Sequence, residues 1–102
     1  MRILKYRLPA MGAPGLDLDP PNIIDLPMAA RPIAVGIQGE TMMLWVEVDE
    51  GTEETTTERR FWVIGTGWPI ELTGRKMKHI GTVLELESSF VWHVYEELGI
   101  GS

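Results

Sequence analysis

The chain has 102 residues, and its 15 acidic and 9 basic side chains give a net charge of −6. This length predicts one domain over residues 1–102 with a single hydrophobic core, and an apolar share of 44% is typical of a folded protein. The negative charge disfavours direct binding to nucleic acid, because a phosphate backbone is bound mainly through cationic side chains. The absence of cysteine excludes disulfides and thiolate chemistry.

The N-terminal residues alternate between charged and apolar types. Arg2, Lys5 and Arg7 interrupt any apolar run, so the segment predicts neither a signal peptide nor a membrane span. Leu4, Tyr6 and Leu8 recur with a period of two, which indicates a strand with one buried face. Residues 9–21 are rich in proline and glycine and predict an exposed loop, and residues 22–26 predict a short strand.

Two alternating runs, 33–37 and 42–48, predict a hairpin with Gly39-Glu40 at its turn. A two-residue turn pairs Ile37 with Met42, Val35 with Leu44 and Ile33 with Val46, so one face is wholly apolar. On the other face Trp45 lies opposite Ala34, and Met43 lies opposite Gly36. The large Trp45 ring is therefore expected to remain uncovered, because the residues opposite and beside it are small.

Residues 49–58 are acidic and threonine-rich and predict a solvated loop. The next strand, 61–64, is expected to turn Phe61 and Val63 inward, and Arg60, Trp62 and Ile64 outward. A second hairpin is predicted from 78–86 and 90–95 around Ser88-Ser89. Its expected pairs are Leu86 with Val91, Leu84 with His93, and Thr82 with Tyr95, on the face that forms the core. Phe90, Trp92 and Val94 are expected on the reverse face.

Six to seven short strands, with no segment of helical period, predict an all-β fold, a small antiparallel sandwich or barrel. In this arrangement three tryptophans lie opposite the main core stripe of their strands. A sheet with two apolar faces must cover the second one. Three coverings are open: residues 1–32 together with the Trp68-Pro69-Ile70 loop, a second subunit, or a nucleotide base stacked on Trp62 or Trp92 near Arg60. The candidate binding or interface residues are Trp45, Arg60, Trp62, Phe90 and Trp92.

No catalytic, metal or cofactor motif is present, so we expect no metal and no cofactor, and an enzymatic activity has no support in the sequence. The predicted register places His79 and His93 about 16 Å apart along the sheet, too far to share a metal ion. Each histidine is expected to be a half-buried residue with a backbone partner.

Several short strand and turn motifs, taken together, resemble a family of small tailed-phage proteins of unknown function. The matching segments are 4–6 with Leu8, 24–27, 33–38, 44–45 with 48–49, 60–61, 65–67, 80–82 and 91–94. The chain departs from that family in its 9–21 insert and its 49–58 loop. The resemblance implies a phage origin and a compact β structure, and assigns no residue a role.

These observations lead to the hypothesis of a non-enzymatic phage accessory protein in the host cytoplasm, which self-associates through its second aromatic face and acts by binding. Two forms are sequestration of a signalling nucleotide and blockade of a host defence protein. The alternatives are a structural head or tail protein of the virion and a small nucleotide-modifying enzyme. We expect no membrane partner.

Overall fold

The computed structural model describes residues 1–11, 22–51, 54–71, 74–86 and 89–99. These residues form seven strands: β1 (Arg2–Leu8), β2 (Asn22–Pro27), β3 (Arg31–Gln38), β4 (Thr41–Val48), β5 (Thr56–Gly65), β6 (Lys76–Leu84) and β7 (Val91–Leu98). In this part of the chain no helix is long and apolar enough to cross a membrane. Most of the predicted 9–21 loop and Ser88 of the predicted turn lie outside the described residues.

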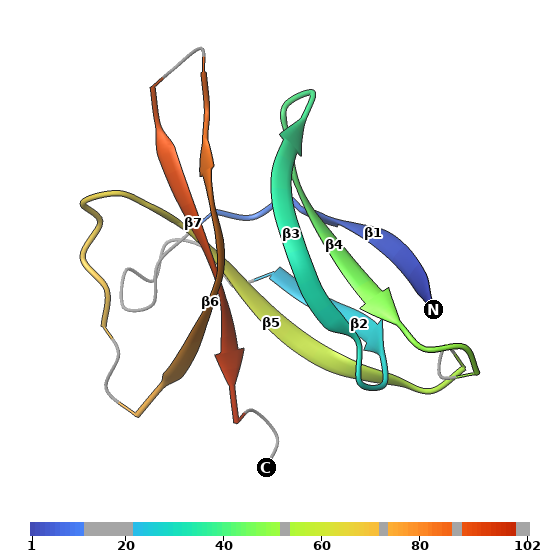
Figure 1. The fold of residues 1–102 in the computed structure, drawn as a ribbon. Coiled ribbons are helices and arrows are strands. Elements are labelled where there is room, and N and C mark those ends of the chain that lie inside the picture. The colour runs from blue at the N-terminus through green and yellow to red at the C-terminus, as the bar shows by residue number, and fades with distance from the viewer. Residues whose placement is uncertain (12–21, 52–53, 72–73, 87–88, 100–102) are drawn as a thin grey trace.

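The strands form two antiparallel sheets that pack as a sandwich (Figure 1). The three-stranded sheet has the order β1-β4-β3, and the four-stranded sheet has the order β2-β5-β7-β6. The molecule measures 40 × 33 × 17 Å along its principal axes. The predicted all-β fold is confirmed, and of its two forms the sandwich is the one observed.

The β3–β4 hairpin follows the predicted register at its tip. Gly39 has a φ of 64°, the left-handed region that a tight turn requires. Ile37 pairs with Met42 and Val35 with Leu44, as predicted. The third predicted pair is wrong: Val46 pairs with Pro32, because a bulge displaces Ile33 from the ladder. Ile33 is consequently exposed.

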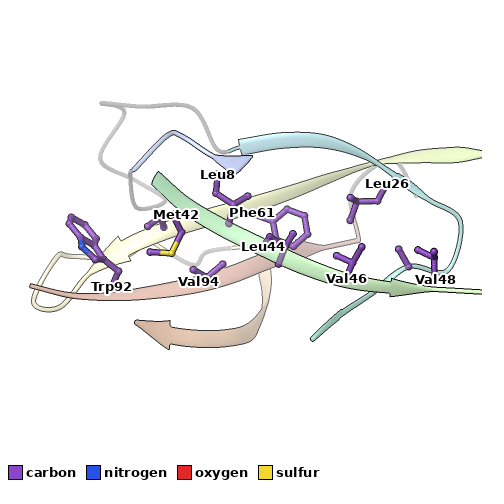
Figure 2. Close-up of a cluster of buried hydrophobic side chains, with 11 residues drawn as sticks. Leu8, Leu26, Met42, Leu44, Val46, Val48, Phe61, Trp92 and Val94 are labelled. Carbon is purple, nitrogen blue, oxygen red and sulfur yellow. The ribbon is translucent and has the colours of Figure 1, made fainter. Parts of the chain in front are cut away.

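The core lies between the two sheets and includes inward-facing residues of both (Figure 2). The labelled side chains form an elongated row, with Trp92 at one end and Val48 at the other. Phe61 and Val63 face inward, as predicted. The buried members of this core are Leu8, Leu26, Ala30, Met42, Leu44, Val46, Val48, Phe61, Val63, Trp92 and Val94.

The β6–β7 hairpin differs from its prediction in register and in the face that it buries. Leu84 pairs with Val91 and Thr82 with His93, two residues away from the predicted pairing, because the turn is longer than two residues. Trp92 and Val94 face the core, whereas Leu84 is 58% and Leu86 84% exposed. The predicted assignment of the two faces of this hairpin is therefore wrong.

β6 contains a second irregularity. His79 pairs with Tyr95 and Gly81 with Val94, so Ile80 is an extra residue in a bulge. Beyond the bulge Gly81 and Val83 face inward, towards β3 of the other sheet. A Cβ atom added to Gly81 would lie 2.6 Å from Cγ2 of Val35. The two sheets therefore approach at a point where only glycine fits.

β5 is longer than predicted. It begins at Thr56, so residues 56–58 of the expected 49–58 loop belong to a strand and pair with β2. Its inward-facing Arg59 forms a two-point ion pair with Glu96 of β7, with Nε–Oε2 and Nη2–Oε1 distances of 2.6 and 2.8 Å. Arg59 also donates to the carbonyl of Ala30, in the connection between β2 and β3. The Arg59 side chain thus connects β5 with β7 and with the segment that links β2 to β3 of the other sheet.

The close approach at Gly81 predicts a steric cost. Gly81→Ala should lower the free energy of unfolding by about 1–3 kcal/mol, because Val35 is β-branched and has little freedom to move. Adding Val35→Ala should recover part of this loss, so the two changes should be less than additive in chemical denaturation. Gly36→Ala is the matched strand control, since its added Cβ would meet its nearest neighbour at 3.4 Å. Equal losses for both glycines would contradict the steric explanation.

The ion pair of Arg59 predicts a second effect. Glu96→Gln should destabilise the fold by about 3 kcal/mol, because it leaves an almost buried guanidinium without its counter-charge. Glu58→Gln, an exposed neighbour on β5, should change stability by less than about 0.5 kcal/mol. Urea denaturation measures both variants, and a Glu96→Gln protein as stable as the control would refute a structural role for the pair.

Candidate functional site

A row of polar side chains crosses the outer surface of the four-stranded sheet. The Oγ1 of Thr66 lies 2.8 Å from Nε2 of His93, whose Nδ1 lies 3.0 Å from Oγ1 of Thr82. That same hydroxyl oxygen lies 2.9 Å from Nε2 of His79. We call these four residues the histidine–threonine row. It joins the end of β5 to β7 and β6.

The direction of the hydrogen bonds in the row follows from its first member. The Thr66 hydroxyl lies 3.3 Å from the carbonyl of Val91 and donates to it. Its oxygen therefore accepts from Nε2–H of His93, which leaves Nδ1 of that ring to accept from Thr82. The Thr82 oxygen in turn accepts from Nε2–H of His79. For neutral imidazole rings, this arrangement fixes both histidines in the Nε2–H tautomer.

The row corrects the predicted separation of the two histidines. Sequence pairing put His79 and His93 far apart, but both contact one hydroxyl group. The slipped hairpin register brings Thr82 opposite His93, and the bulge at Ile80 turns Thr82 to the same face as His79. Their partners are side chains and not the predicted backbone groups. The described residues contain no group of three or more side chains able to hold a metal ion.

An apolar patch lies next to the row. Trp62 and Ile64 of β5 are buried on this outer surface, and Met77 and Tyr95 pack against them. The Tyr95 ring is 5.1 Å from the His79 ring, which links the patch to the row. We call the row and this patch together the β5–β7–β6 face. A cavity of only about 70 Å³ opens on it, lined by Ile64, Ile70, Met77 and Tyr95.

Trp62 faces outward, as predicted, but other side chains of the same chain cover it. Its exposed fraction is 5%, and its Nε1 donates to Oε1 of Glu97 at 3.0 Å. Arg75 also donates to that oxygen at 2.8 Å and lies 5.7 Å above the indole ring. A nucleotide base would have to displace Arg75 to stack there. Side chains of the same chain thus cover this residue, but Arg75 and Glu97 belong neither to residues 1–32 nor to the Trp68-Pro69-Ile70 loop, the covering segments suggested by the sequence.

Trp92 occupies a different place from the predicted one. Its side chain lies in the main core and is 7% exposed, and its Nε1 donates to Glu85 at 2.8 Å. The prediction that it faces away from the core is wrong: the two faces of the hairpin are composed as predicted, but the face with Trp92 and Val94 is the buried one. Trp68 meets its ring edge-on at 5.5 Å, and Phe90 lies at 5.7 Å. The Phe90 side chain is 60% exposed.

Arg60 and Trp45 lie on outward-facing positions of different sheets. Arg60 is on β5 beside Ile23 and Glu97, and its Nε is buried with no hydrogen-bond partner. It shares a face with Trp62 but not with Trp92. Trp45 lies on the three-stranded sheet, opposite Ala34 as predicted. The structure therefore does not gather the five predicted residues at one site.

A larger groove of about 530 Å³ opens between the β3–β4 and β6–β7 hairpins. It is lined mainly by aliphatic side chains, including Ile37, Val83 and Leu86, and its charged groups are the carboxylates of Glu40 and Glu85. Glu85 is already bonded to Trp92. Among the described residues that line it, no set of polar side chains converges to orient a ligand.

The hydrogen-bond chain predicts the tautomer of His93. Long-range ¹H–¹⁵N spectra should show the Nε2–H form, and Thr82→Val should remove this preference while lowering stability by about 1 kcal/mol. Thr57→Val, an exposed threonine of β5 outside the row, serves as the control. An Nδ1–H tautomer for His93 in the unmodified protein would contradict the assigned direction.

The comparisons with known proteins concern the whole chain. No curated protein and no solved structure matches it. A family model, described as a domain of unknown function (DUF7352), matches residues 1–99. Because this model matches nearly the whole chain, the protein belongs to the DUF7352 family.

Proposed function

We propose that the protein is a non-enzymatic phage accessory protein that acts by binding in the host cytoplasm, and that two copies associate through the β5–β7–β6 face. The phage origin rests on the sequence resemblance described above. The observation that carries the binding role is the histidine–threonine row beside the patch of Tyr95 and Met77. Exposed donors and acceptors next to aromatic and apolar groups are the composition of protein interfaces.

The shallow shape of the β5–β7–β6 face favours a macromolecular partner. Small-molecule sites usually enclose about 300–1,000 Å³. The cavity beside Tyr95 measures only about 70 Å³. A flat surface of this kind matches another flat protein surface better than it encloses a small ligand. Of the two forms of action considered from the sequence, this favours blockade of a host protein.

Charge opposes a second copy less on this face than on the rest of the surface. Two chains with a net charge of −6 repel one another over most of their surfaces. On this face Arg75 and Glu97 form an ion pair at 2.8 Å, and the row consists of hydroxyl and imidazole groups without a carboxylate. The β5–β7–β6 face therefore repels a second copy less strongly than the acidic remainder of the surface does. A two-fold contact also lets donors of one copy meet acceptors of the other.

The molar mass in solution tests the association. We expect sedimentation equilibrium to give a dimer at tens of micromolar, and Thr82→Lys to weaken it at least about tenfold, because it places an unpaired charge on each copy within the proposed contact. Thr57→Lys adds the same charge outside the face and should leave the dimer intact. Circular dichroism confirms the fold of both variants. A wild-type chain that stays monomeric at several hundred micromolar would refute this part of the proposal.

A further inference from the structure

The outer surface of the three-stranded sheet carries one half-buried indole ring, that of Trp45. Trp45 rests on the backbone of β3, where a Cβ atom added to Gly36 would lie 3.4 Å from Cζ3 and 3.7 Å from Cη2 of the ring. Its neighbour across the strand pair is Ala34, so no β3 side chain beside it is tall enough to cover the ring. Among the described residues, no other ring and no guanidinium stacks on Trp45.

The indole N–H distinguishes Trp45 from the two other tryptophans that the sequence singled out. Trp62 and Trp92 donate this hydrogen to Glu97 and Glu85. Within the described part of the chain Trp45 has no such acceptor. Its ring and its donor are both available to a ligand.

Two cations of β1 lie on the same face of the sheet as this ring. Lys5 lies opposite Trp45 on β1, and Arg7 lies opposite Met43. The ammonium group of Lys5 lies 2.9 Å from Oε1 of Gln38 on β3, so its side chain extends across β4. Both cations are exposed, and neither forms an ion pair with a described residue. Two positive charges without counter-charges are notable on an acidic chain.

A third cation nearby is neutralised. Arg31 lies 2.8 Å from Glu47 and 3.2 Å from Asp49. Through its hydrogen bond and its charge, Arg31 lowers the pKa of the Asp49 carboxyl group below the usual value. This ion-paired cluster keeps both carboxylates engaged, so positive charge beside Trp45 comes from Lys5 and Arg7.

We propose that Trp45, Lys5 and Arg7 form a binding site for a nucleoside 5′-phosphate. The planar base stacks on the open face of the indole ring, and the phosphate oxygens accept hydrogen bonds from the ammonium and guanidinium groups. The negative charge of the whole protein disfavours a long polyanion, whereas one compact phosphate group responds mainly to the two cations beside it. The site is on the opposite sheet from the β5–β7–β6 face, and it functions whether or not that face forms a dimer.

Binding of ATP tests the site. Adenosine probes base stacking alone, and inorganic triphosphate probes phosphate binding alone. In ¹H–¹⁵N spectra, ATP should shift the indole signal of Trp45, identified by its loss in Trp45→Phe, and leave those of Trp62 and Trp92 in place. In calorimetry, Lys5→Gln and Arg7→Gln should each weaken ATP binding at least about fivefold. Lys76→Gln, an exposed cation of the other sheet, should leave the affinity unchanged. Adenosine and triphosphate should each bind more weakly than ATP.

Three results would overturn the proposal. One is an unshifted Trp45 signal at millimolar ATP, and another is equal ATP affinity in the Lys5 and Arg7 variants. The third is tight binding of a single-stranded oligonucleotide without binding of ATP, which would replace the nucleotide site with a nucleic-acid surface. Lys5 and Arg7 are exposed, so their variants remain informative if a change at Trp45 impairs folding.

Discussion

The extra residue in β6 controls both surfaces of the four-stranded sheet. Side chains of a strand alternate between its faces, so the bulge at Ile80 exchanges the faces of every residue after it. On the inner side it places Gly81 against Val35 of the other sheet, a contact too close for a larger residue. On the outer side it places Thr82 between His79 and His93. The packing of the sandwich and the histidine–threonine row thus depend on one local feature of the backbone.

The tryptophans on the two outer surfaces of the sandwich have opposite environments. On the four-stranded sheet Trp62 is held by Glu97 and covered by Arg75. On the three-stranded sheet the small residues of β3 support Trp45 from below, and the neighbouring cations bond to no carboxylate of the described chain. The first surface is closed and flat, which suits a protein partner. The second keeps an aromatic ring and positive charge accessible, which suits a small aromatic anion.

Sequence periodicity was sufficient for the number of strands and for the tip of the β3–β4 hairpin, where a glycine with positive φ fixes a short turn. It failed for the β6–β7 hairpin, because a longer turn and a bulge both change which residues face each other, and neither alters the alternation of apolar residues. Trp92 was misplaced for another reason: both faces of β7 carry apolar residues, so alternation alone does not tell which face is buried. Gly81 inside a strand was the one local sign of a bulge. Thr66 and Thr82 were missed as site residues because their role depends on neighbours distant in the sequence.

The same interruptions of regular pairing limit how copies of this sandwich can join. Four strands, β1, β2, β3 and β6, lie at the borders of their sheets. β2 ends in Pro27, β3 contains Pro32 and a bulge, and β6 is bent by its extra residue. Proline and bulges deprive a border strand of the continuous donors and acceptors that a neighbouring chain needs. Continued growth into fibrils by strand addition is thereby discouraged at these three borders, which agrees with the association through a face proposed above.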